Sequence, residues 1–147
     1  MNYVRFLTGN HILNMAILAW FTAQFLKLII VLVRSRKLDF KRLVGSGGMP
    51  SSHSACVMAM SVSVAKITGI QSVEFAIAVT IAIVVMYDAS NVRHAAGEQA
   101  KILNYMMEHW SEQTPAIFGR ELKELLGHTP IQVIAGALLG FLIGMFF

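Results

Sequence analysis

The sequence predicts an all-α, polytopic membrane protein with four transmembrane helices, and three observations lead to that prediction. Of the 147 residues, 56% are hydrophobic and only 14% are charged. The mean hydropathy of +0.62 lies outside the usual range of soluble domains. The apolar residues also gather into runs near the roughly 17 to 25 residues that a helix needs to cross a hydrocarbon core. Residues 1–147 are therefore expected to form a single membrane-embedded domain.

The four predicted spans are residues 11–33, 54–70, 73–89 and 131–147. Each is expected to be helical, because backbone polar groups in lipid must be satisfied within their own segment. The first run is too long for a signal peptide, and no small-residue cleavage site follows it. Only Gln71 and Ser72 separate the second span from the third, which predicts a tight antiparallel hairpin.

The connection between the third and fourth spans predicts further helix. Apolar residues at Phe118, Leu122, Leu125 and Leu126 alternate with charged residues, as in an amphipathic helix lying at the membrane interface. The apolar pattern of residues 102–110 indicates either that the third helix continues past the membrane or that a second surface helix follows it.

The distribution of basic residues predicts the orientation. Because consecutive spans alternate in direction, both long connections lie on one side of the membrane. They carry most of the basic residues: Arg34, Arg36, Lys37, Lys41, Arg42, Arg93, Lys101, Arg120 and Lys123. An excess of Lys and Arg marks the cytoplasmic face. Both connections are expected inside a cell membrane and both termini outside.

Metal sites, cofactors and nucleic acid are not expected. The single cysteine, Cys56, can form neither an intrachain disulfide nor a cysteine metal cluster, and it reads as a packing residue. Small residues spaced four apart, at 136, 140 and 144 and again at 55, 59 and 63, are typical of close helix packing in lipid. They would pack the bundle or form a homodimer.

The polar side chains that could take part in chemistry are expected to converge on the cytoplasmic face. Lys27 and Arg34 are two helical turns apart near the end of the first span. The other clusters lie where spans begin or end on the same side: Pro50 to His53, Asp88 to His94, and His128 with Gln132. Charged residues in spans are costly unless they are used, so this convergence speaks against a purely structural subunit.

The stretch "GSGGMPSSHSA" at residues 45–55 predicts an anion site. Glycine lets a backbone approach a ligand closely, and Pro50 is expected at the first helical position, where a missing N–H does no harm. The free N–H groups of the helix start attract anions. With Lys27, Arg34 and Arg93 nearby, a phosphate group is the natural occupant. Two imidazoles beside it suggest nucleophilic attack by one and acid catalysis by the other.

These residues resemble the three motifs of the type 2 phosphatidic acid phosphatase and vanadium haloperoxidase superfamily, whose usual patterns are K-x6-R-P, P-S-x-H and S-R-x5-H-x3-D. The matching segments are Lys27-x6-Arg34, Pro50-Ser51-Ser52-His53 and a third that begins at His128-Thr129-Pro130-x-Gln132. The chain is most similar to a short, divergent branch, through "GGMPSSHSA", "DASNVRHAAGEQA" and "LLGHTP". The resemblance covers nearly the whole length.

The resemblance implies a role for each matching residue. Lys27, Arg34, Ser51 and Ser52 would bind phosphate, His53 would be the general acid and His128 the nucleophile. Arg93 would be the arginine of the third motif, although a long insertion separates it from His128, and Lys123 is an alternative.

Gln132 stands where the superfamily has an acidic residue that orients the nucleophile. Either the imidazole is less activated, or Asp88 or Glu98 assists. The pattern Thr129-x-x-Gln132 is also a capping box, so Gln132 could serve only as a helix cap.

The expected function is metal-independent hydrolysis of a lipid phosphate through a phosphohistidine, with sensitivity to vanadate. The substrate class is a phosphate ester or diphosphate of a lipid, such as phosphatidic acid, phosphatidylglycerol phosphate or a polyprenyl diphosphate. The alternative is a non-catalytic protein that binds or transports an anion with the same basic cage. The alternatives differ in one observable, the release of inorganic phosphate.

Overall fold

A computed structural model describes residues 8–36, 48–109 and 127–147, except for the side chains of residues 34, 35, 108 and 109. The helices are α1 (His11–Ser35), α3 (Ser52–Thr68), α4 (Val73–Tyr87), α5 (Arg93–His109) and α6 (Pro130–Phe146). A π-helical turn, η1 (Asp88–Val92), joins α4 to α5. The predicted all-α class is confirmed. The predicted amphipathic helix near residues 118–126 lies outside the described residues.

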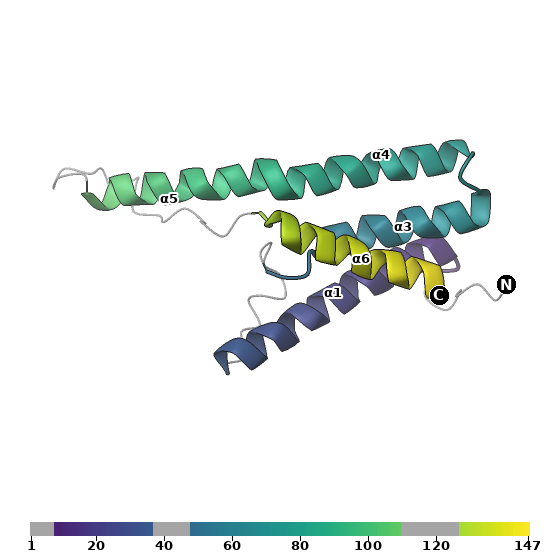
Figure 1. The fold of residues 1–147 in the computed structure, drawn as a ribbon, viewed down its shortest axis with the longest axis horizontal. Helices are drawn as coiled ribbons and strands as arrows, with labels where there is room; N and C mark the ends of the chain where they lie inside the picture. Colours follow the sequence, from purple (N-terminus) through teal and green to yellow (C-terminus); the bar gives the residue numbers. More distant parts are fainter. Residues whose placement is uncertain (1–7, 37–47, 110–126) are drawn as a thin grey trace.

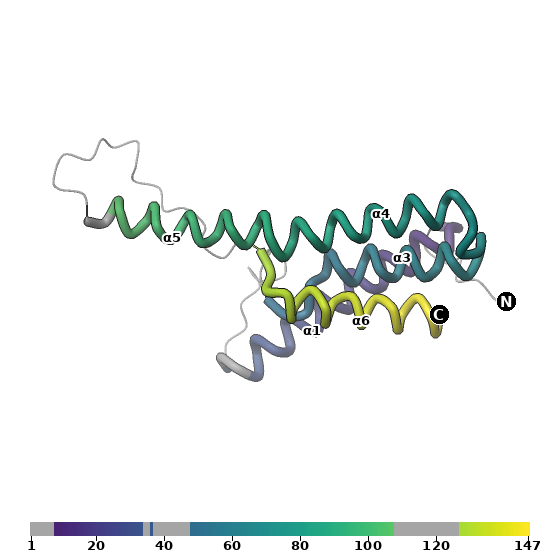
Figure 2. Tube along the Cα trace, turned by 45° about the horizontal axis from the view of Figure 1, so that its top comes forward, coloured from purple at the N-terminus to yellow at the C-terminus, as the bar shows by residue number. Residues whose placement is uncertain are grey.

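Helix α3 is the central element of the bundle. It packs against α1, α4 and α6, and its buried positions are mostly small. Figure 1 shows α1 and α6 on one side of α3 and the long α4–η1–α5 helix on the other, with α5 extending past the ends of α3 and α6. The start of α1 and the end of α6 lie at the same end of the molecule, and Figure 2 gives the same arrangement.

Side-chain caps set where the helices begin. The side chains of Asn10, Ser51 and Ser72 accept hydrogen bonds from the backbone N–H groups of Leu13, Ser54 and Phe75. Helix α3 therefore begins at Ser52, two residues before the predicted span 54–70. The prediction that Pro50 occupies its first position was wrong, because Ser51 is the cap and Pro50 precedes it.

The glycines of α6 let it approach α3 closely. A Cβ atom added to Gly136 or Gly140 would lie 2.2 Å from the carbonyl oxygen of Ser51 or Ala55, respectively. One added to Gly144 would lie 2.8 Å from Cβ of Val62. The two predicted small-residue faces thus pack against each other within one chain. A homodimer through these faces stays a prediction.

Two helices of the described chain are long and apolar enough to cross a membrane, where four spans were predicted. They are His11–Val33, with a mean hydropathy of 2.2, and the continuous Val73–Met107, with 1.8. Pro130–Phe146 is apolar but shorter, and α3 has 17 residues. The third predicted span does continue as helix beyond residue 89, which was one of the two expected alternatives.

Candidate functional site

Two histidines from distant parts of the chain meet at one end of the bundle. His53 lies in the first turn of α3 and His128 immediately precedes α6. The centroids of their rings are 6.2 Å apart, with an angle of 61° between the ring planes. The convergence that the motifs predicted therefore brings His53 and His128 to one place.

A single oxygen atom of Gln132 fixes the tautomer of His128. Oε1 of Gln132 accepts a hydrogen bond from the backbone N–H of Thr129 at 3.2 Å, so this atom is the carbonyl oxygen of the amide. The same atom lies 3.1 Å from Nδ1 of His128. Because an oxygen acceptor faces Nδ1, we assign the proton to this ring nitrogen, and Nε2 then presents its lone pair. Gln132 thus serves as the helix cap and also orients His128, the two roles that the sequence left open.

Nε2 of His128 and Nζ of Lys27 are the unsatisfied atoms of the site. The two residues are each only 2% exposed, and neither atom has a hydrogen-bond partner among the described residues. Both Lys27 and His53 lie within electrostatic reach of the His128 ring. Buried polar groups without partners are rare in proteins, and a bound polar ligand is one explanation for them.

Burial lowers the pKa of His128 below its ordinary value of 6.5. The main cause is desolvation, since a buried imidazole holds a charge less readily. The hydrogen bond to Gln132 and, more weakly, the backbone of Gly48 raise the pKa, whereas the positive charges of Lys27 and His53 lower it further. His128 is therefore mainly neutral at pH 7, the form in which an imidazole nitrogen is able to act as a nucleophile.

The start of α3 supplies further donors to this region. The backbone N–H of Ser51 is already bonded to the carbonyl oxygen of Gln132 at 3.0 Å, and its hydroxyl accepts a hydrogen bond from that of Ser54. Ser51 therefore has its hydroxyl proton to offer a ligand, but no backbone N–H. The N–H groups of Ser52 and His53 make no hydrogen bond with the described residues. They form the anion-attracting end of the helix.

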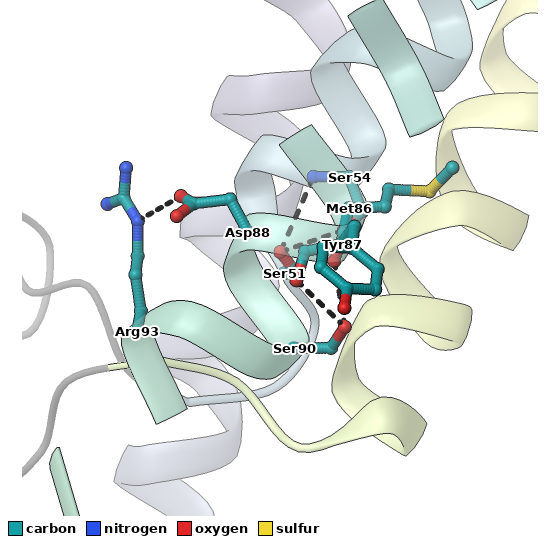
Figure 3. A network of polar contacts seen from close by, with 7 residues as sticks. All are labelled: Ser51, Ser54, Met86, Tyr87, Asp88, Ser90 and Arg93. Atoms are coloured by element: carbon teal, nitrogen blue, oxygen red, sulfur yellow. Dashed lines mark hydrogen bonds and ion pairs between the residues drawn. The ribbon is translucent and has the colours of Figure 1, made fainter. Parts of the chain in front are cut away.

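The other predicted site residues are placed as follows. Arg93 and Asp88 form an ion pair with each other, Nε to Oδ2 at 2.6 Å, and in Figure 3 they lie to one side of Ser51 and Ser54.

Arg34 lies in the last turn of α1, but its side chain is outside the described part of the chain, as is Lys123 altogether. Glu98 pairs with Lys101 on the exposed face of α5. Among the described residues, no group of three or more His, Cys, Asp or Glu side chains could hold a metal ion.

Glycines and the π-turn support the site, and sequence reasoning missed both roles. A Cβ atom on Gly48 would lie 3.3 Å from Cγ and Cδ of Lys27, so the glycine backbone packs on the lysine stem. Gly127 approaches the backbone of Arg93 and His94, where an added Cβ would lie 2.3 Å from N of His94. The backbone N–H of His128 donates to the carbonyl oxygen of Ala89 in η1 at 2.9 Å. The glycine directly before His128 was the available signal, but it also fits a helix stop.

Comparison with known proteins identifies the family of this chain. The model of the divergent PAP2 family matches residues 8–143. The chain is 42% identical over 131 residues to the uncharacterized membrane protein YuiD of Bacillus subtilis (strain 168). The aligned region covers 82% of this chain and 83% of that protein. No solved structure matches the chain. The match over most of the length, with the paired histidines at the predicted helix ends, shows that the chain belongs to the divergent PAP2 family.

Proposed function

We propose that this protein is a membrane lipid phosphate phosphatase that works through a phosphohistidine at His128. The observation that carries the proposal is a pair of buried atoms beside His53, Nε2 of His128 and Nζ of Lys27, neither of which has a hydrogen-bond partner among the described residues. Family membership supports it, because the PAP2-related family includes phosphatases.

The proposed reaction has two displacements at phosphorus. Nε2 of His128 attacks the phosphorus atom, the bond from phosphorus to the ester oxygen breaks, and His53 gives its proton to the departing lipid alcohol. In the second displacement, a water molecule attacks phosphorus and gives a proton to His53, the bond from phosphorus to Nε2 of His128 breaks, and inorganic phosphate leaves. Lys27 and the N–H groups at the start of α3 stabilise the negative charge on the equatorial oxygens.

A lipid substrate suits the position of the site. Large apolar side chains are exposed along α1, α4 and α6, as expected for surfaces that face lipid. We infer that all four apolar segments cross a cell membrane, with the site at its cytoplasmic interface. Lys27 lies six residues before Val33, the end of the first apolar segment, which is about 9 Å of helix. A phosphate at Lys27 would therefore sit near headgroup depth, with its lipid chains in the membrane.

The test is phosphate release by the purified protein in detergent. Phosphatidic acid, phosphatidylglycerol phosphate and a polyprenyl diphosphate are offered without divalent metal to the wild type, His128→Ala and the exposed-histidine control His94→Ala. We expect release by the wild type and by His94→Ala, inhibition by vanadate, and a loss of at least about 1000-fold in His128→Ala. Undiminished release by His128→Ala would disprove the nucleophile.

A second function, anion binding without turnover, is favoured by Gln132 alone. Its amide orients His128 but supplies no negative charge to stabilise the imidazolium. This reading predicts that the wild type binds inorganic phosphate but releases none from any of these lipids. The same purified protein decides between the two functions.

A further inference from the structure

The π-turn η1 creates an ion pair that an ordinary helix would not form. Asp88 and Arg93 are five residues apart, and in an α-helix five residues turn the chain about 140° beyond a full circle, so the two side chains would diverge. In η1 the backbone N–H of Arg93 bonds to the carbonyl oxygen of Asp88. This five-residue spacing brings the two residues into line.

The ion pair uses only one of the donors of Arg93. Nε donates to Oδ2 of Asp88 at 2.6 Å, whereas the terminal Nη atoms have no hydrogen bond to the described part of the chain. The guanidinium is therefore anchored on one side. Its two outer nitrogens are left for an anion, which arginine binds through paired N–H groups.

The guanidinium of Arg93 lies near His53, and the turn that carries Arg93 contacts the backbone before α6. Arg93 and Asp88 both lie within electrostatic reach of His53. The same turn holds the backbone before α6, because Ala89 accepts from the N–H of His128 and Gly127 packs on the peptide between Arg93 and His94. The position of the Arg93 backbone relative to His128 is thereby set by η1.

We propose that Asp88 is a positioning residue, which anchors Arg93 through Nε so that the Nη atoms meet the substrate phosphate. This inference rests on the proposed function. Holding a long side chain in place beforehand removes the entropy loss that would otherwise oppose binding. The carboxylate also repels an anion, but the two side chains are 48% and 37% exposed, so solvent screens that repulsion.

The test compares two substitutions of Asp88 in the purified, full-length protein. Asp88→Ala removes the acceptor and should raise KM about three- to tenfold with little change in kcat, as expected when one side chain must be ordered on binding. Asp88→Asn keeps an oxygen acceptor, so its KM should stay closer to that of the wild type than the KM of Asp88→Ala. In an Arg93→Ala background, Asp88→Ala should have no further effect, because the two residues act as one unit. Should Asp88→Ala not fold, Asp88→Glu replaces it, with a smaller rise in KM.

Glu98→Ala is the matched control, since it removes the acceptor of a similarly exposed ion pair, Glu98 with Lys101, on α5. A KM for Asp88→Ala equal to that of Glu98→Ala would overturn the inference, and so would a fall in KM in both Asp88 variants, which would show repulsion instead.

The proposed function fails separately, if the wild type releases no phosphate. In that case the dissociation constant of inorganic phosphate, measured by titration of the same variants, replaces KM. Weaker binding by Asp88→Ala than by Glu98→Ala would support the positioning role without catalysis. Equal binding, or no binding by the wild type, would refute it.

Discussion

At the scale of residues, the site depends on a few buried atoms that have no hydrogen-bond partner in the described part of the chain. A buried ammonium without a hydrogen bond costs stability, because water solvates it far better than a protein interior does. Lys27 is in that state, with its stem against Gly48 and its Nζ unpartnered among the described residues. Such a cost is acceptable where the charge meets a ligand.

Lys27→Met should therefore separate stability from function. Methionine fills a similar volume without charge, so the free energy of unfolding should rise by about 1 kcal/mol and the melting temperature by about 3 °C. Activity, measured as kcat/KM, should fall about 100-fold, as when one donor to a developing negative charge is lost. Lys66→Met is the control, because Lys66 bonds to the carbonyl oxygens of Gly144 and Met145 far from the site. It should lower stability and leave activity unchanged.

The lowered pKa of His128 predicts a pH dependence in a stated direction. The unfolded chain binds a proton at this position near pH 6.5, while the folded protein binds it only at lower pH. The unfolded state therefore holds more protons between these two values, so the free energy of unfolding falls as pH drops below 6.5 and levels off below the folded pKa.

Thermal unfolding of the wild type and His128→Gln between pH 4 and 8 measures this effect. Below pH 6.5, the melting temperature of the wild type should fall more steeply than that of His128→Gln. The kcat/KM of the wild type should begin to fall only below pH 6.5, because the lowered pKa of His128 keeps the proposed nucleophile neutral above that pH. A loss of activity already complete at pH 6.5 would contradict the lowered pKa.

At the scale of elements, the π-turn η1 follows α4 and contacts the segment that carries His128. Ser90 contributes to this irregular turn by donating its hydroxyl to the carbonyl oxygens of Met86 and Tyr87, as Figure 3 shows. π-turns inside α-helices occur frequently at functional sites. Here the turn provides a backbone acceptor for His128 and a surface for Gly127.

Gly127→Ala should displace His128. The residue has a φ of +93°, and a Cβ would lie 2.3 Å from the backbone nitrogen of His94. We expect kcat to fall at least about tenfold, because a nucleophile displaced by a fraction of an ångström loses its alignment.

Gly69→Ala is the matched control for this variant. Gly69 has a similar φ of +88° but nothing within 4 Å of an added Cβ. Both substitutions should cost at least about 1 kcal/mol of stability for the backbone conformation. Gly127→Ala should cost more, because of the contact with the backbone of His94, and it alone should also impair catalysis. Equal activity of the two variants would show that Gly127 does not position His128.

At the scale of the whole molecule, the helix from Val73 to Met107 is longer than a membrane is thick. Its 35 residues extend about 52 Å, against a hydrocarbon core of about 30 Å. The excess lies in α5, beyond η1 and on the side of the candidate site, as Figure 1 shows. Under the proposed topology, this part of the helix stands at or above the cytoplasmic interface.

Accessibility labelling checks that orientation. In a Cys56→Ser background, Asn91→Cys places a thiol at the end with the site, and Gln71→Cys places one in the α3–α4 connection at the other end; both positions are exposed. In intact cells, a membrane-impermeant maleimide should label Gln71→Cys alone. After permeabilisation it should label both. Labelling of Asn91→Cys in intact cells would place the site outside.

The sequence by itself determined the helical class, the family and the meeting of His53 with His128. Hydropathy and helix caps depend on neighbours along the chain, and the motif residues can be read one by one. The continuous α4–η1–α5 helix could be stated only as one of two alternatives, because the residues that follow the apolar run are compatible with either.

Only the tertiary structure decided how the site is supported. The double role of Gln132, the pairing of Asp88 with Arg93 and the contact of Gly127 with the π-turn all depend on distances between segments far apart in the chain. A residue type states which hydrogen bonds a side chain is able to make. Which of them it does make is settled by packing, since that alone brings the partner to within about 3 Å.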